Sequence, residues 1–122
     1  MRERWEVEYS AEFEVWWNSL EEPMQEAIAH DIGVLEQIGP LLGRPHVDTI
    51  AGSRHANMKE LRTRYAGHQY RTLFAFDPRR TAILLIAGDK TTDKRFYKTA
   101  IARADDVYER HLAALRKQGL IS

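Results

Sequence analysis

The chain has 122 residues and no cysteine, and 43% of its residues are hydrophobic, with 18 acidic residues balanced by 18 basic ones. This length predicts one domain with a single core over residues 1–122, and the composition excludes a disordered chain, a disulfide framework and a thiolate zinc site. No apolar run has the length of a membrane span and the charged start is unlike a secretory leader, so we expect a cytoplasmic protein with no membrane association.

The net charge of zero conceals an uneven distribution along the chain. Residues 1–40 carry 2 basic and 10 acidic residues, a net charge of −8, whereas residues 41–122 carry 16 basic and 8 acidic residues, a net charge of +8. Either the two parts form solvated faces of opposite sign, or the second part forms a basic surface for RNA, DNA or an acidic protein. The acidic residues of the first part would serve solvation or contact with a basic partner.

Residues 1–40 predict a strand followed by a helical hairpin. The segment Trp5–Tyr9 alternates apolar and polar residues, which is typical of a strand. Ser10 is a suitable cap for a first helix, and Pro23 favours the start of a second helix that ends at Gly39. Residues 40–57 are rich in turn-forming residues and predict a long loop.

The hydrophobic period changes to two in residues 57–88, which predicts a three-stranded antiparallel meander. Its strands are Asn57–Tyr65, Gln69–Asp77 and Thr81–Ala87, joined by short turns. A final helix is expected over residues 93–116. The sequence therefore predicts an α+β fold in which an antiparallel meander sheet plus an N-terminal strand is packed by two N-terminal helices and one C-terminal helix.

Basic side chains recur on neighbouring strands of this meander. Alternation places Glu60, Arg62 and Arg64 on one face of the first strand and Lys59 on the other. Because arginine forks match phosphate oxygens, a patch on these strands would hold a nucleic-acid backbone, unless its members are ordinary surface cations. The candidate members are Arg62, Arg64, Arg71, Lys90 and Lys94. Tyr97 is either a core aromatic or a phenol that faces this patch, where it would stack on a base or transfer a proton.

Other site chemistries have weaker support in the sequence. His46 and Asp48 have ligand types but no strong metal spacing, so no metal site is expected. His55 and His68 fall in loops or turns and are candidates for a general acid or base. The chain has no glycine-rich phosphate loop and no nucleophile elbow.

Several segments, taken in order, resemble the HigB-like, phage-derived branch of the RelE/ParE toxin superfamily. The most specific are Lys59-Glu-Leu-Arg62 and Gly88-Asp-Lys90, supported by Gly43–Ile50, Tyr70–Asp77 and the pair Phe96-Tyr97. Together the similar segments span residues 5–115. The resemblance implies a RelE-like fold and the toxin of a type II toxin–antitoxin pair.

Members of this branch are metal-independent endoribonucleases without a cofactor, and they cleave messenger RNA, usually on the translating ribosome. The RNA 2′-hydroxyl attacks the adjacent phosphate, which leaves a 2′,3′-cyclic phosphate and a 5′-hydroxyl. The implied partners are a HigA-like antitoxin with a helix-turn-helix domain and mRNA on the ribosome.

Carried over by position, the resemblance implies four catalytic residues, Arg62, Arg71, Lys90 and Tyr97. The implied RNA-binding residues are Lys59, Arg64, His68, Lys94 and Arg95. The chain departs from the RelE pattern at three positions, with Met58 and Glu60 in place of lysines and Thr91 in place of an arginine. The general base therefore stays open among Lys59, His55 and His68.

Two other functions compete with RNA cleavage. A ParE-like protein would inhibit DNA gyrase or another topoisomerase by binding, and a degenerate member would only bind its antitoxin or RNA. The retained cations and Tyr97 argue against the first alternative, whereas Glu60 and Thr91 favour the second.

Overall fold

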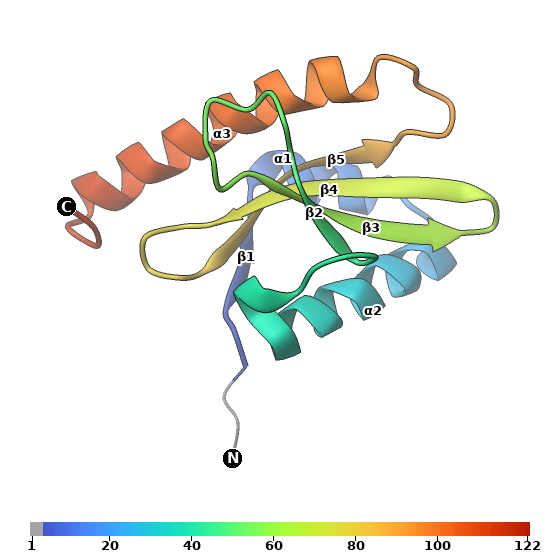
Figure 1. Ribbon diagram of the computed structural model, residues 1–122, viewed down its shortest axis with the longest axis horizontal. Helices are drawn as coiled ribbons and strands as arrows, with labels where there is room; N and C mark the ends of the chain where they lie inside the picture. The colour runs from blue at the N-terminus through green and yellow to red at the C-terminus, as the bar shows by residue number, and fades with distance from the viewer. Residues whose placement is uncertain (1–3) are drawn as a thin grey trace.

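The computed structural model describes residues 4–122, so the first three residues of the charged start, where we expected no leader, lie outside it. Figure 1 shows the order of elements. They are β1 (Val7–Tyr9), α1 (Ala11–Asn18), α2 (Glu22–Ile38), a 3₁₀ turn η1 (Gly39–Leu41), β2 (Val47–Thr49), β3 (Lys59–Tyr65), β4 (His68–Phe76), β5 (Ala82–Asp89) and α3 (Phe96–Lys117). The predicted α+β fold is confirmed.

The five strands form one mixed sheet in the order β1-β5-β4-β3-β2. The pairs β3–β4 and β4–β5 are antiparallel, which confirms the meander, while β1 runs parallel to β5. Ala66 and Gly67 form the two-residue turn between β3 and β4, and both have positive φ, 49° and 82°, as tight hairpin turns require.

One predicted element was wrong. Residues 40–57 do not form a continuous loop, because Val47–Thr49 pairs with Leu61–Lys59 as the edge strand β2. A strand of three residues is too short to show a period of two, and its stability comes from pairing with β3. The last helix begins at Phe96 rather than near Asp93, whose carboxylate instead accepts the Arg95 N–H in the preceding turn.

The helix starts follow from local chemistry. Ser10 Oγ accepts the Phe13 N–H at 3.0 Å at the start of α1, as predicted for a capping serine. Pro23 lies in the first turn of α2, where its missing N–H costs nothing. In the described part of the chain, no helix combines the length and the apolar character that a bilayer crossing requires.

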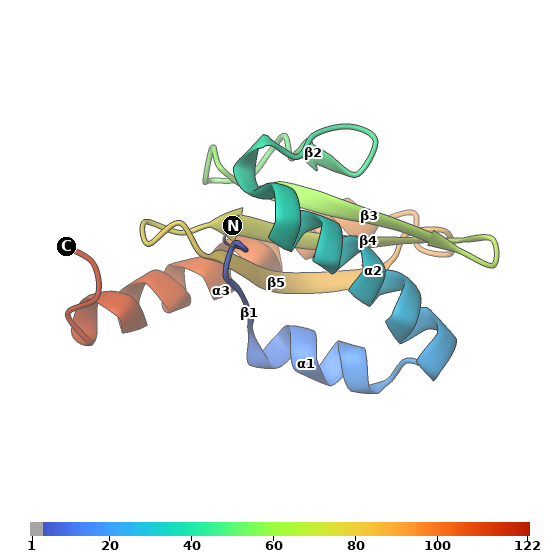
Figure 2. The same ribbon diagram turned by 90° about the horizontal axis from the view of Figure 1, so that it is seen from below.

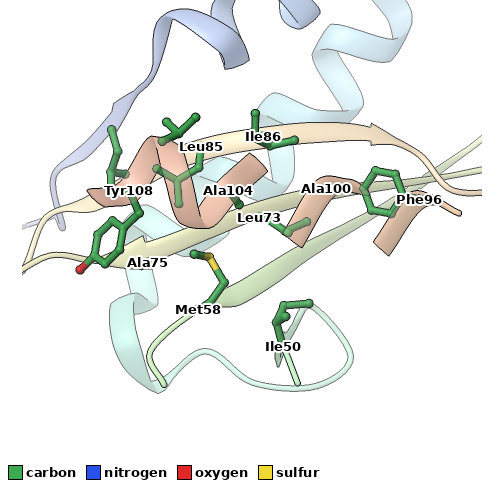
Figure 3. Close-up of a cluster of buried hydrophobic side chains, with 12 residues drawn as sticks. Ile50, Met58, Leu73, Ala75, Leu85, Ile86, Phe96, Ala100, Ala104 and Tyr108 are labelled. Atoms are coloured by element: carbon green, nitrogen blue, oxygen red, sulfur yellow. The ribbon is translucent and has the colours of Figure 1, made fainter. Parts of the chain in front are cut away.

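The sheet lies between two helical layers (Figures 1 and 2). One face packs against α1 and α2 through a cluster that includes Phe13, Leu35 and Phe74. The other face packs against α3 through a second cluster, drawn in Figure 3, that includes Leu73 and Ala104. Phe74, Leu73 and Ala104 are each 0% exposed, so the central strands are covered on both faces.

A β-bulge in β5 rearranges the end of the sheet that carries the basic residues. The register between β4 and β5 shifts at Leu73/Phe74, so that Leu73 pairs with Ile86 and Arg71 pairs with Gly88. A side chain on Gly88 would meet the Phe96 ring at 2.8 Å. The bulge and this glycine therefore let the start of α3 pack closely on β5.

A buried carboxylate stabilises the turn at the opposite end of the sheet. Asp77 accepts the Arg79 N–H at 2.8 Å and lies 2.9 Å from His111 Nε2 on α3. Burial raises the pKa of Asp77, but the hydrogen bonds from Arg79 and His111 outweigh it and hold this pKa below its usual value. The ionised form is therefore favoured in the folded state.

We expect Asp77→Asn to lower the free energy of unfolding by about 1–2 kcal/mol at pH 7. A carboxyl with a lowered folded pKa contributes stability above its unfolded pKa and loses it as the pH falls through the folded value. The difference between wild type and variant should therefore shrink between pH 5 and pH 2. Urea unfolding across this range checks the prediction, and a difference that stays constant with pH would contradict it.

Candidate functional site

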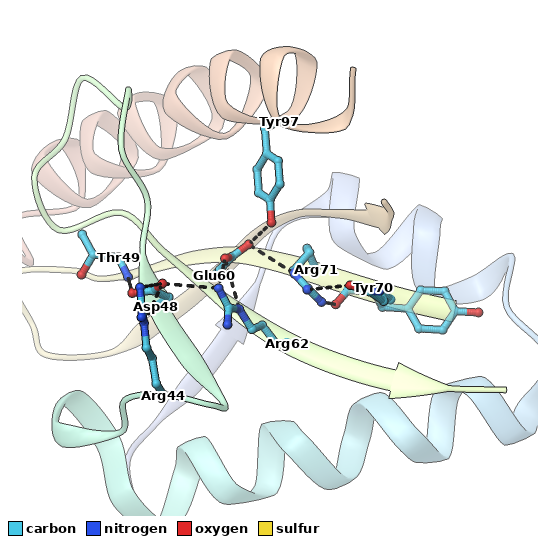
Figure 4. Close-up of polar contacts among 9 residues, drawn as sticks. Arg44, Asp48, Thr49, Glu60, Arg62, Tyr70, Arg71 and Tyr97 are labelled. Carbon is cyan, nitrogen blue, oxygen red and sulfur yellow. Dashed lines mark hydrogen bonds and ion pairs between the residues drawn. The ribbon is translucent and has the colours of Figure 1, made fainter. Parts of the chain in front are cut away.

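The candidate site is a cluster of charged and phenolic side chains on the α3 face of the sheet, centred on Glu60 (Figure 4). Glu60 Oε1 accepts a hydrogen bond from the Tyr97 hydroxyl at 2.7 Å. Its other oxygen, Oε2, accepts from Arg62 Nη2 and Nε at 3.2 and 3.3 Å. The Glu60 side chain is only 5% exposed, so its charge depends on these partners rather than on water.

Arg71 lies on β4 directly opposite Arg62 on β3. Like charges at facing positions repel, and the carboxylate of Glu60, 3.5 Å from Arg71 Nε, compensates this repulsion. Arg71 donates from its two terminal nitrogens to the Tyr70 carbonyl and to Gln69 Oε1. Its buried Nε has no hydrogen-bond partner among the described residues, which leaves one donor of a buried guanidinium available to an added acceptor.

Tyr97 lies in the first turn of α3, where the Phe96 contact with Gly88 positions it over the sheet. Burial, and then the hydrogen bond to Glu60, raise the pKa of its phenol. The Tyr97 hydroxyl is therefore protonated at neutral pH and donates to the carboxylate.

Lys90 follows β5 and brings a third cation to the cluster. Its Nζ lies 5.6 Å from the centre of the Tyr97 ring, within the range of a cation–π contact. Partial burial, and then the charge of Arg71, lower the pKa of this ammonium. Lys90 therefore gives up a proton more readily than a solvated lysine.

The structure brings together the four residues to which the resemblance assigned catalysis, Arg62, Arg71, Lys90 and Tyr97. Of the residues expected to bind RNA, Arg64 lies at the border of this cluster and is exposed further along β3. His68 begins β4 with its Nδ1 at 2.5 Å from Asp89. Its ring stacks on Tyr70, which packs against α1, so His68 lies on the opposite face of the sheet. Lys94 and Arg95 are exposed in the segment that leads into α3.

The structure places all three candidates for the general base outside the cluster. Lys59 lies on the opposite face of β3, where its Nζ donates to the Pro40 carbonyl at 3.3 Å. His55 stands against α3, with its Nε2 at 2.9 Å from Glu109. Its loop is held there because the buried carboxylate of Asp105 accepts from Ser53 Oγ and from the Arg54 N–H. The third candidate, His68, is engaged with Asp89.

Sequence reasoning treated Glu60 as a departure from a pattern and missed it as a site residue. The signal was nevertheless present, because alternation placed Glu60 on the same strand face as Arg62. An acidic residue beside an arginine on a half-buried strand face indicates a paired, functional or structural carboxylate. Only the tertiary contact with Tyr97 identifies it as the centre of the cluster.

The balance of charge suits an anionic ligand. Arg62, Arg71 and Lys90 provide three positive charges around the single negative charge of Glu60, and Asp48 partly balances Arg62 from β2 at 3.3 Å. Among residues 4–122, no three histidine or carboxylate side chains gather as metal ligands would. The cluster offers donors for phosphate oxygens, one carboxylate to accept a proton and two groups, Tyr97 and Lys90, to hold or donate one.

The fold and this cluster define the class of the protein, a RelE-like α+β domain with a buried arginine–carboxylate centre. Comparison with known proteins agrees, since residues 15–109 match the family described as phage-derived protein Gp49-like. The protein named "Putative toxin HigB2" of Mycobacterium tuberculosis is 48% identical over 100 residues, 80% of this chain and 50% of that protein. "Putative toxin HigB3" of the same organism is 46% identical over 102 residues, 83% of this chain and 88% of that protein.

The chain belongs to the phage-derived Gp49-like family, and the resemblance to HigB-like toxins is confirmed. It spans about half the length of HigB2 and most of the length of HigB3.

Proposed function

We propose that this chain is the toxin of a type II toxin–antitoxin system and that it cleaves messenger RNA on the ribosome without a metal or cofactor. The observation that carries this proposal is the convergence of Arg62, Arg71, Lys90 and Tyr97 around the buried carboxylate of Glu60. The names of its relatives support the toxin role. A cytoplasmic location and a HigA-like antitoxin with a helix-turn-helix domain are part of the proposal.

The proposed reaction uses the residues of the cluster in three roles. Glu60 accepts the proton of the RNA 2′-hydroxyl as its oxygen bonds to phosphorus, and Tyr97 orients this carboxylate through their hydrogen bond. Arg62 and Arg71 neutralise the charge that develops on the phosphorane oxygens. The Nε of Arg71, which has no hydrogen-bond partner among the described residues, is an additional donor. As the bond from phosphorus to the 5′-oxygen breaks, the ammonium of Lys90 protonates that oxygen.

Tyr97→Phe tests this function because it removes one hydroxyl and leaves the ring in place. Tyr97 positions the carboxylate that accepts the proton, and misplacing a reacting group by about 1 Å costs about a hundredfold, so we expect about hundredfold slower cleavage of a defined message on translating ribosomes. The wild-type products should carry 5′-hydroxyl and 2′,3′-cyclic phosphate ends and should form in the presence of EDTA. The free energy of unfolding should fall by only about 1 kcal/mol, the contribution of one hydrogen bond.

Expression in growing cells separates the alternatives. Growth arrest with new RNA 5′ ends inside translated messages supports cleavage, and both should disappear in the Tyr97→Phe variant. Arrest without such ends, together with inhibition of gyrase supercoiling by the purified protein, would instead select a ParE-like inhibitor. Absence of both arrest and cleavage would leave a binding-only protein. Rescue and co-purification by the product of the neighbouring open reading frame tests the antitoxin.

A further inference from the structure

A groove lies on the sheet face covered by α1 and α2, away from the Glu60 cluster, which lies on the α3 face. Its volume is about 440 Å³. The lining is mostly apolar and aromatic, and it comes from β1, α1, α2 and β5. It includes Tyr9, Phe13, Trp17, Ile32 and Leu84, with Glu14 and Glu36 among the polar members.

The groove follows from how the two N-terminal helices pack. The short helix α1 packs on β5, whereas α2 packs on β3, so the two helices rest on different strands (Figure 2). Side chains from both helices line the groove between them. The strand β1 forms the edge of the sheet here and pairs with β5. The Tyr9 side chain at this edge is a large aromatic group that remains 58% exposed.

The segment that forms most of the groove is acidic, and two of its carboxylates, Glu14 and Glu36, line the groove. Between residues 4 and 40 there are nine acidic side chains and one basic side chain, Arg4. Three of the acidic residues form ion pairs, Glu8 with Arg79, Glu12 with Arg110 and Glu36 with Arg4. The other six have no ion pair to a described residue, and they are Glu6, Glu14, Glu21, Glu22, Glu26 and Asp31. The excess of negative charge on this segment favours a cationic partner over a nucleic-acid backbone.

We propose that this groove binds a basic amphipathic helix of a partner protein. Apolar side chains of that helix would insert against Trp17, Phe13 and Tyr9, since aromatic pockets of this kind supply most of the energy in such interfaces. Lysines or arginines on its flanks would pair with Glu14 in the groove lining and with the other unpaired carboxylates of α1 and α2.

The geometry favours a helix over an added strand. The strand β1 has only three residues, Val7–Tyr9, which is too short for a stable new ladder of backbone hydrogen bonds. A helix satisfies its own backbone groups before it enters an apolar floor. This docking site is independent of RNA cleavage, because it uses the opposite face of the sheet.

The test is a selection of displayed helix-forming peptides, unbiased in charge, on the whole protein. The expected peptides have a net positive charge and apolar residues at i, i+3, i+4 and i+7. Their synthetic versions should bind about tenfold more weakly at high salt. The exposed Glu14→Lys variant should weaken binding by about tenfold, whereas Glu26→Lys, the same change outside the groove lining, should weaken it less.

Three outcomes would overturn the proposal. They are the enrichment of no peptide, the enrichment of neutral or acidic peptides, and equal effects of the Glu14 and Glu26 variants on binding. A second variant, Trp17→Ser, should abolish binding through loss of the aromatic floor, with its folding checked by urea unfolding. The experiment measures peptide binding, so its result is independent of whether the protein cleaves RNA.

Discussion

Replacing Arg71 by glutamine should slow RNA cleavage on translating ribosomes by about 10²–10³-fold, the loss typical for removal of one preorganised donor to an oxyanion. Arg71 is 3% exposed, and a buried charge acts on a developing phosphorane charge with little screening by water. Glutamine keeps a donor, but it has neither the charge nor the Nε, which has no hydrogen-bond partner among the described residues.

Two further variants test whether the effect depends on the chemistry of the guanidinium and on its position. Arg71→Lys keeps the charge and loses the planar fork, so its cleavage rate should fall between those of wild type and Arg71→Gln. Arg116→Gln makes the same chemical change near the end of α3 and should cleave as wild type does. An Arg71→Gln protein that unfolds like the wild type and cleaves at a similar rate would show that Arg71 does not stabilise the reacting phosphate.

Replacing Glu60 by leucine should lower the free energy of unfolding by about 3–5 kcal/mol, or prevent folding, because it leaves the buried charge of Arg71 without a carboxylate. The Glu60 and Arg71 side chains are 5% and 3% exposed. Their attraction offsets the cost of burying two charges, and removing one partner leaves that cost in place.

The double variant Glu60→Leu/Arg71→Met separates this effect from a simple loss of packing. Removing both charges together should recover at least half of the lost stability, measured by urea unfolding as a double-mutant cycle. Glu26→Leu, at an exposed position of α2, should change the free energy of unfolding by less than about 0.5 kcal/mol. Additive losses in the double variant would show that the two side chains are not coupled.

Much of the fold was predictable because helix caps and turns depend on residues that are close together in the sequence. The Ser10 cap, the start of α2 at Pro23 and the two-residue turn at Ala66-Gly67 each depend on neighbouring residues alone. The apolar run within Ala82–Asp89 is continuous because β5 is covered on both faces. The strand β2 escaped prediction because three residues show no period and depend on pairing with β3.

The sequence allowed the cations of the candidate site to be predicted, but not the carboxylate at its centre. The motif resemblance identified Arg62, Arg71, Lys90 and Tyr97, which the structure brings together. It did not assign Glu60, since a carboxylate has a role only through the groups around it. It also left Lys59 and His55 as candidates for the base, because alternation and loop position do not reveal contacts with Pro40 and Glu109.

By itself, the sequence determined every element except β2 and η1, the family, and the split of charge between the two parts of the chain. These features depend on which residue types occur and how they are spaced along the chain, and both can be read from the sequence. The tertiary structure alone decided that a bulge in β5 and a glycine under Phe96 bring Tyr97 onto Glu60. It also decided that α1 and α2 leave an apolar groove among acidic residues, because such contacts join residues far apart in sequence that only packing brings together.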